Sequence, residues 1–411
     1  MNIRKENIYD LTVCVYVLCT VVADDGSLLM KLARLFLAGI WGVKMLTEKT
    51  IKITPYLLRL AAFWAFATMT ILWAEDRGFA VSMSKSLMIN LVCMCALLNL
   101  MDHQRQRMDF ILKTLIAAPI ILEMRVILQG GLLAFLDTRT IGSISGNTVG
   151  MCAAFGACFA AYYWIQGEKC KYGILFAVNT VIVILSASKK ALLFECIPLV
   201  TFFLFDRKIP KSRRLLRAFL LLMAGGTGLV LLVKIPILYD LIGNRLEGMV
   251  ATLVGNAEKA DGSSEARALL ITRGMQWFRE RPLQGYGIDC YRVVLVKNHP
   301  TWPIDAYAHN NYVELLVDTG LIGTVLYYWN YAEALRIGWK NRDSIHHTEL
   351  LAMGILLALL VGEMALVSYY DKYVQVLVLT LAVLISEFPP EEKWVKPMPF
   401  PDIPMGKRYT H

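Results

Sequence analysis

Apolar residues along the chain come in runs long enough to cross a membrane. A helix that rises about 1.5 Å per residue needs roughly 20 residues to span about 30 Å of hydrocarbon. About twelve such runs occur, so the sequence predicts an all-α, polytopic membrane helix bundle of about 12 transmembrane helices. The runs begin near Ile8, Ser27, Tyr56, Val81, Asp109, Thr148, Tyr172, Ala191, Leu215, Asn311, Leu350 and Tyr373.

The short connections between these runs alternate in basic charge, which predicts the orientation. Lys and Arg are retained on the cytoplasmic side of a membrane. With the N-terminus inside, most of the basic residues fall in cytoplasmic loops, and both termini are predicted to be cytoplasmic in the plasma membrane. Asp24 and Asp25 follow the first run where a signal peptide would have a cleavage site, so this run is expected to remain as an anchor. The basic residues of the inner loops are Lys49, Lys52, Arg105, Arg107, Lys169, Lys171, Arg207, Lys208, Lys211, Arg213, Arg214, Arg336, Lys340 and Arg342.

One connection is much longer than the others and divides the chain. We expect transmembrane helices 1–9 in residues 1–235, a large extracytoplasmic loop in 236–310, helices 10–12 in 311–388 and a cytoplasmic tail in 389–411. A loop of this length is usually functional or disordered. We expect it to contain short interfacial helices, one of them from Glu265 to Glu280, and Pro282, Gly285 and Gly287 predict a sharp turn. This loop is therefore the part in which we expect a functional site.

Composition supports a membrane protein and excludes some other classes. Of 411 residues, 56% are hydrophobic and 18% are charged. The net charge of +9 follows from the basic cytoplasmic loops, so it is no sign of nucleic-acid binding. The 9 cysteines are scattered without a Cys-x-x-Cys pair, which predicts neither a disulfide framework nor a zinc site.

Basic residues cluster in the second half of the long loop. From Arg267 to Lys297 there are six bases and two acids, which leaves a net charge of +4. Arginine meets phosphate oxygens in a bidentate geometry, so this stretch suits a phosphate-bearing lipid headgroup. Non-specific attraction to anionic lipid is the alternative.

His309 stands at the start of the tenth predicted span. Only His299 and His309 face outward in this topology. Val313, Leu316, Gly320 and Gly323 follow His309 along one stripe of a helix, and the two glycines would let a neighbouring helix approach closely. His309 is therefore a candidate general base, and the alternative is an interfacial histidine bonded to a headgroup.

Two acids lie on the same predicted helix as this histidine. Glu314 and Asp318 are four residues apart, and helix rise puts Asp318 roughly 13 Å below His309. Ionisable groups at that depth are costly unless they are paired or face water. They are candidates to orient the imidazole or to pair with a base of the loop, and a purely structural ion pair between helices is the alternative.

The order of these residues resembles the O-antigen ligase and polymerase superfamily. His309-Asn310, nine residues and then Gly320-Leu-Ile-Gly323-Thr324 match its His-Asn motif, and Arg267 followed by Pro282-Leu-Gln-Gly285-Tyr-Gly287 is similar to its upstream stretch. Gly146-Asn147 and the segment from Trp73 to Asp76 also fall where the family has comparable residues. One departure is Ser188-Lys189-Lys190, where the family usually carries Ser-Arg-Gly. Lysine keeps the charge there but loses the planar fork.

The resemblance implies glycan transfer from an undecaprenyl-diphosphate-linked oligosaccharide to an acceptor hydroxyl, outside the cell, with no cofactor and no metal. It implies that Arg267, Arg273 and Lys189 bind the donor diphosphate and that His309 is the base. Asn310, Glu314 and Asp318 would position the substrate. The lipid bilayer, the glycan acceptor, a chain-length regulator and a flippase are the expected partners.

Several activities fit this interpretation. We expect a polymerase that joins surface-polysaccharide repeat units, because such polymerases are the most widespread members of the superfamily. A ligase onto lipid A core and a protein O-oligosaccharyltransferase are the alternatives within it. A transporter or flippase of about twelve spans lacks support, since the two halves of the chain show no repeat. A metal-dependent glycosyltransferase would need Asp289, His299, Asp305 and His309 as ligands, and their spacing matches no known pattern.

Overall fold

A computed structural model gives the fold, and it describes residues 5–101, 105–138, 140–167, 170–186, 188–205, 212, 234, 262–342 and 347–386. The predicted span from Leu215, residues 236–261 of the loop, and the tail 389–411 lie outside the described residues, apart from single positions. The first helices are α1 (Lys5–Val22), α2 (Leu28–Glu48), α3 (Pro55–Met69), η1 (Thr70–Leu72), α4 (Arg77–Met101), α5 (Arg105–Gly130), α6 (Leu132–Thr138), α7 (Gly146–Ile165), α8 (Lys171–Leu185) and α9 (Lys189–Phe205). The later ones are α13 (Gly262–Glu280), α14 (Tyr291–Asn298), α15 (Asn311–Lys340), α16 (His347–Gly362) and α17 (Lys372–Ser386).

The all-α class is confirmed, with one small exception. Eleven of the twelve predicted apolar runs are helices in the described residues, and the twelfth, from Leu215, is the one outside them. The exception is a hairpin of β1 (Thr140–Ile141) and β2 (Ile144–Ser145), which no apolar pattern marked. The short helix α6 was not predicted either, because it contains no long apolar run. Short helices were expected in the long loop, but the sequence did not indicate bounds for α14.

Local sequence signals explain where several helices begin. Thr54 caps α3 by accepting a hydrogen bond from the Leu57 N–H, and Pro55 stands at the first turn, where a missing N–H costs nothing. Ser145 caps α7 in the same way, with its hydroxyl accepting from Thr148. Helix starts are therefore set by side chains next to the apolar runs.

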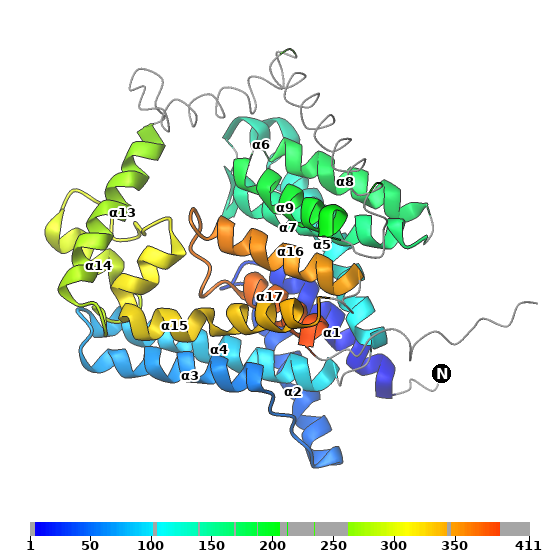
Figure 1. The fold of residues 1–411 in the computed structure, drawn as a ribbon, viewed down its shortest axis with the longest axis horizontal. Helices are drawn as coiled ribbons and strands as arrows, with labels where there is room; N and C mark the ends of the chain where they lie inside the picture. Colours follow the sequence, from blue (N-terminus) through cyan, green and yellow to red (C-terminus); the bar gives the residue numbers. More distant parts are fainter. Residues whose placement is uncertain are drawn as a thin grey trace, which may run out of the picture.

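The helices form one bundle with a smaller unit at one side (Figure 1). Helix α15 runs along α3 and packs against α17, while α16 packs against α9. Helices α13 and α14 lie together near the start of α15, away from the group that α5, α7 and α8 form (Figure 1). The N-terminal half of α15 therefore joins the bundle to the smaller unit.

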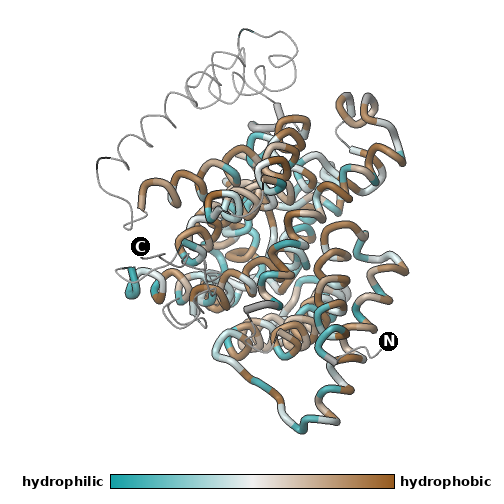
Figure 2. Tube along the Cα trace, turned by 90° about the vertical axis from the view of Figure 1, so that its right-hand side faces the viewer, coloured by the Kyte–Doolittle hydropathy of each residue, from teal (hydrophilic) through white to brown (hydrophobic). Residues whose placement is uncertain are grey.

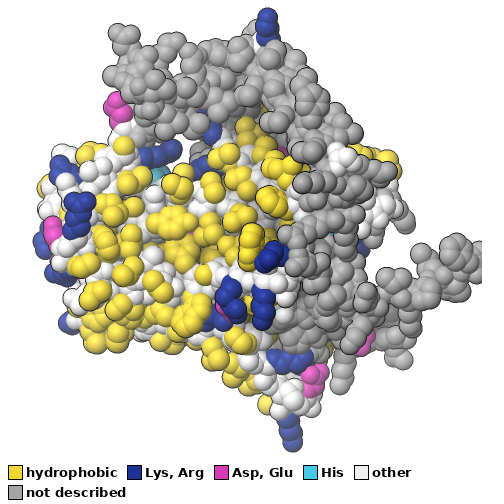
Figure 3. All heavy atoms as spheres, in the orientation of Figure 1, with side chains coloured by type: hydrophobic (Ala, Val, Ile, Leu, Met, Phe, Trp, Pro, Cys, Tyr) yellow, Lys and Arg dark blue, Asp and Glu magenta, His cyan; other side chains and the backbone are white. Residues whose placement is uncertain are grey.

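The surface of this bundle is suited to lipid. Hydrophobic residues predominate along most of the helices (Figure 2), and hydrophobic side chains cover much of the described part of the face in Figure 3. Leu46, Leu72 and Leu128 are 80%, 73% and 84% exposed, which would be costly in water. By length and composition, three helices in the described residues can cross a membrane: Pro55–Leu72, Arg77–Met101 and Gly146–Ile165. The count of twelve spans stays a prediction.

The smaller unit has a hydrophobic core of its own. Trp277 of α13, Tyr291 of α14 and Val317 of α15 are buried in it, and the rings of Trp277 and Tyr291 meet edge to face with centroids 5.6 Å apart. At Gly274 an added Cβ would lie 2.4 Å from Val313, so α13 and α15 are in close contact there. This core orders the second half of the long loop and holds it against the start of α15.

Candidate functional site

The loop after α13 is joined to α15 through a break in the helix. Gly320 has φ 63° and ψ −166° in the middle of α15, so the helix is interrupted there. The N–H groups of Tyr286 and Gly287 donate to the carbonyls of Val317 and Asp318, at 2.8 Å each. On the far side of the break, the Leu321 N–H donates to the Pro282 carbonyl, also at 2.8 Å. Backbone groups that the break frees are thus paired with the loop.

Glycines are required on both sides of this joint. A Cβ at Gly285 would lie 2.5 Å from the Asp318 carbonyl oxygen, and one at Gly320 would lie 2.4 Å from the Leu283 carbonyl. The sequence analysis expected Gly320 and Gly323 to admit a neighbouring helix. In the structure the close neighbour of Gly320 is the loop after α13, and a Cβ at Gly323 would meet the Thr319 side chain of its own helix. The two halves of the motif are therefore one interlocked unit.

The segment between η1 and α4 fastens the same loop from the other side. Trp73 Nε1 donates to the Gln284 carbonyl at 3.2 Å, and the Glu75 N–H donates to the Tyr286 carbonyl at 2.9 Å. The Glu75 carboxylate pairs with Arg281 at 3.1 Å and with Lys297 at 3.0 Å. Part of the predicted basic patch is therefore neutralised by an acid from a distant segment.

His309 is fixed by its two neighbours in the chain. Its own φ of 53° is in the left-handed region. The Ala308 N–H donates to Glu314 Oε2 at 2.6 Å, and Asn310 caps α15 by accepting from the Val313 N–H at 3.1 Å. Glu314 is 1% exposed, so this bond to Ala308 is shielded from solvent. Glu314 and Asn310 thus position His309 through the backbone on either side of it.

Two cations from distant helices act on the His309 ring. Burial, then Arg267 of α13 and Lys190 of α9, lower the pKa of His309 from 6.5 to about 4. The Tyr307 ring lies 4.0 Å from the imidazole, centre to centre. The imidazole is therefore neutral at neutral pH, as a proton acceptor must be. Figure 3 shows Lys and Arg side chains around a hollow between the parts of the chain that hold α13 and α16.

The predicted donor-binding residues are brought together only in part. Arg267 makes no hydrogen bond or ion pair within the described residues, and its charge acts on His309. Arg273 lies six residues further along α13, about 120° around the helix, and donates to Gln276 at 3.1 Å. Lys189 begins α9, but the lysine whose charge lowers the His309 pKa is Lys190.

Asp318 has a structural place in this arrangement. It is fully buried and accepts hydrogen bonds from the N–H groups of Asp289, at 3.0 Å, and Tyr291, at 2.6 Å. These are the orphan donors at the start of α14, where a carboxylate is favourable. The Asp318 carboxylate thus binds the backbone of the loop. It also accepts a hydrogen bond from the Tyr369 hydroxyl, in the segment after α16, at 3.4 Å.

Residues that could hold a metal ion do not gather in the described part of the chain. No group of three or more His, Cys, Asp or Glu side chains with a suitable arrangement occurs there. Asp289 instead pairs with Arg292 at 2.8 Å, and burial raises its pKa to about 6.

Lys190, Tyr307 and the segment after α16 were not identified from the sequence. Tyr307 had a signal in the sequence, since it is an aromatic residue two positions before His309. Lys190 is adjacent to the predicted Lys189. The sequence at the start of a helix does not indicate which of two neighbouring lysines will lie near a distant histidine. Gly146-Asn147, by contrast, was identified from the sequence. It lies next to the lysine pair, because the Ser188 hydroxyl donates to Asn147 Oδ1 at 2.9 Å.

Residues 174–328 match the O-antigen ligase family. The matched stretch includes Lys190, Arg267 and His309, so these three residues of the candidate site all lie within it. This match supports assignment of the chain to the O-antigen ligase-related superfamily, and with the apolar helices it supports a membrane protein. No curated protein matches the chain.

The difference between the two lysines gives a direct test of the site. We expect Lys190→Met to raise the His309 pKa from about 4 toward 6.5, because a nearby positive charge is lost. The acid limb of the pH–rate profile for glycan transfer would move upward with it. The matched variant Lys189→Met is expected to leave the acid limb in place. A limb that moves in Lys189→Met and not in Lys190→Met would contradict this placement.

Proposed function

We propose that this protein transfers a glycan from an undecaprenyl-diphosphate-linked donor to an acceptor hydroxyl on the extracytoplasmic face of the plasma membrane. The observation that carries the proposal is the half-buried His309, whose pKa both Arg267 and Lys190 lower, next to a helix that is interlocked with the loop. A neutral base next to two cations suits a reaction in which a proton is removed and a diphosphate leaves.

The proposed reaction assigns a step to each of these groups. The acceptor oxygen forms a bond to the anomeric carbon of the donor sugar while its proton passes to His309. The bond between that carbon and the phosphate oxygen breaks, and its electron pair leaves with undecaprenyl diphosphate. Arg267 and Lys190 stabilise the negative charge that develops on this leaving group. In this proposal Lys189 and Arg273 add positive charge around a long lipid-linked substrate.

Asn310, Glu314 and Asp318 support this reaction as positioning residues. Glu314 and Asn310 hold the backbone around His309, and Asp318 holds the loop against α15. A displacement of about 1 Å in a catalytic group is enough to cost about a hundredfold in rate. The buried polar side chains therefore have a function even without contact to the substrate.

Polymerisation of surface-polysaccharide repeat units is the form of this reaction that we propose. A ligase and a protein O-oligosaccharyltransferase would use the same base and the same leaving group, so they differ in the acceptor alone. A chain-length regulator and a flippase are the partners that a polymerase would work with.

Deletion of the gene in its host separates these forms. We expect single repeat units to accumulate on the lipid carrier while long chains disappear, when lipid-linked intermediates and surface glycans are separated by size. Long chains that form but stay on the carrier would contradict polymerisation and identify a transferase to a final acceptor. An unchanged profile in both fractions would contradict glycan transfer altogether.

A further inference from the structure

Glu363 is a fully buried carboxylate directly after α16 that the proposed reaction does not use. It accepts hydrogen bonds from four hydroxyl groups: Ser368 at 2.5 Å, Tyr328 at 2.7 Å, Tyr331 at 3.0 Å and Tyr327 at 3.5 Å. Within the described residues no Lys, Arg or His forms an ion pair with it. A buried carboxylate without a cation is expensive inside a membrane protein, which points to a function.

The backbone that follows this carboxylate holds three groups of the site. The carbonyl of Glu363 accepts from the Asn311 N–H at 2.8 Å, and the carbonyl of Met364 accepts from Asn310 Nδ2 at 3.1 Å. The carbonyl of Ala365 accepts from Lys190 Nζ at 2.5 Å. We call residues 363–365 the platform. It sets the distance between the start of α15, where His309 stands, and the Lys190 ammonium.

Asn311 connects the platform to the hydroxyl groups around the carboxylate. Its Oδ1 accepts from the N–H groups of Ser368, at 2.9 Å, and Tyr369, at 3.1 Å, while its Nδ2 donates to the Tyr328 hydroxyl at 2.9 Å. Tyr328 in turn donates to Glu363. The two ends of the segment from Glu363 to Tyr369 are therefore fastened to the same residue beside the site.

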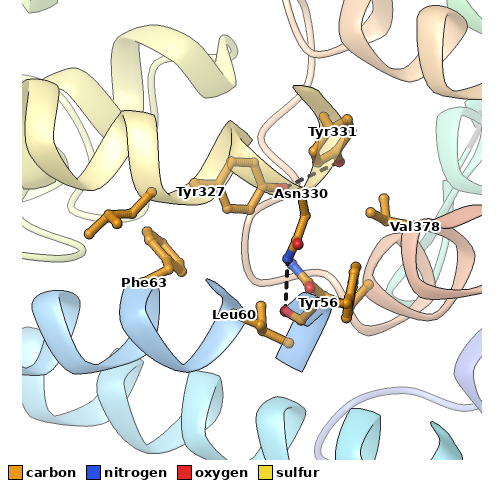
Figure 4. A pocket seen from close by; sticks show the side chains of 9 residues that line it. Tyr56, Leu60, Phe63, Tyr327, Asn330, Tyr331 and Val378 are labelled. Atoms are coloured by element: carbon orange, nitrogen blue, oxygen red, sulfur yellow. Dashed lines mark hydrogen bonds between the residues drawn. The ribbon is translucent and has the colours of Figure 1, made fainter. Parts of the chain in front are cut away.

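The surroundings leave this cluster little room to rearrange. Tyr327 and Tyr331 project from neighbouring turns of α15, with their hydroxyl oxygens 3.5 Å apart, beside a pocket that Asn330 and Tyr56 also line (Figure 4). The pocket has a volume of about 10 Å³, enough for a single water molecule. A carboxylate held in this way keeps one position.

We infer that Glu363 is a positioning residue whose hydroxyl-bound carboxylate fixes the platform and thereby the placement of Lys190 beside His309. The inference rests on the proposed function for its catalytic meaning, but its geometry does not depend on that function. In this inference the buried Glu363 carboxylate keeps the Lys190 ammonium in position.

A measurable consequence follows from the charges that face His309. Arg267 of α13 and Lys190 of α9 both lower its pKa, and Tyr307 lies against its ring. Glu314 of α15 accepts a hydrogen bond from the N–H of the preceding residue, Ala308. Of the two cations, Lys190 is the one held by the platform. If the platform shifts, Lys190 moves while Arg267 stays, and the His309 pKa rises from about 4 toward 6.5.

The test is a titration of His309 in the full-length protein in lipid nanodiscs, by NMR of labelled histidine, with His309→Asn to assign the signal. In Glu363→Gln the side-chain amide places two N–H donors where hydroxyl donors already point. We expect the His309 pKa to rise by about half a unit. Lys190→Met is expected to give a similar rise, and the double variant no more than either alone. Glu195→Gln is the matched control, since Glu195 is a buried carboxylate held by Thr180.

An unchanged His309 pKa in Glu363→Gln, or a shift that adds fully to that of Lys190→Met, would overturn the inference. Should Glu363→Gln fail to fold, Tyr328→Phe and Ser368→Ala each remove one donor and are expected to give smaller shifts of the same sign. No shift in these two folded variants would also overturn it. Because the readout is a titration, its failure is distinguishable from that of the proposed function, which is tested by transfer activity.

Discussion

Glycan transfer falls by about a hundredfold to ten-thousandfold when His309 is replaced by asparagine, which is the loss expected for a general base. Asparagine tolerates the left-handed φ of 53° as histidine does, so the backbone at this position is preserved. Its amide cannot accept the proton of the acceptor hydroxyl at neutral pH. The measurement is the amount of long glycan in a deletion strain that expresses the variant at the wild-type level in the membrane.

The control for this experiment is the second histidine of the loop. His299 is the C-cap residue of α14, and the ring contact of His309 in the described residues is with Tyr307. His299→Asn is therefore expected to retain most of the transfer. Normal glycan product from His309→Asn would remove His309 from the reaction. Equal losses in both variants would indicate damage to the loop rather than loss of the base.

Gly320→Ala is expected to abolish transfer by a different route, through the joint between α15 and the loop. The φ of 63° and ψ of −166° belong to a region that only glycine populates readily, which costs about 1–3 kcal/mol for any other residue. The added Cβ would also lie 2.4 Å from the Leu283 carbonyl, so the backbone must move. We expect faster proteolysis between Arg281 and Asp289 together with the loss of transfer.

A glycine elsewhere in the bundle provides the comparison. An added Cβ at Gly42 of α2 meets nothing within 4 Å, and alanine in a helix is favoured over glycine by about 0.5–1 kcal/mol. Gly42→Ala should therefore leave both transfer and proteolysis unchanged. A Gly320→Ala protein with normal transfer would contradict the interlock between the two motifs.

The positions of the helices could be predicted because apolar runs of about 20 residues leave few other structures in a membrane. The predicted helix from Glu265 to Glu280 agrees with α13, and the predicted turn agrees with the left-handed φ of Gly285 and Gly287. Each of these features is encoded locally, by an apolar run or by glycine and proline.

Long-range backbone contacts could not be predicted in the same way. The break at Gly320 depends on hydrogen bonds with residues more than thirty positions earlier, and a Gly-x-x-Gly stretch reads equally well as a helix contact. The platform after α16 has no sequence signal, because it acts through carbonyl groups that every residue carries. The role of Glu363 could not be predicted either, because it depends on side chains from two other segments of the chain.

Reconstitution of the purified protein in liposomes with an undecaprenyl-diphosphate-linked repeat unit tests the central claim most directly. The account predicts that lipid-linked chains longer than one unit appear with release of undecaprenyl diphosphate, and that His309→Asn in the same liposomes leaves the donor unconsumed. The account would be contradicted if the wild-type protein left the donor intact. It would also be contradicted if the product formed equally well with His309→Asn.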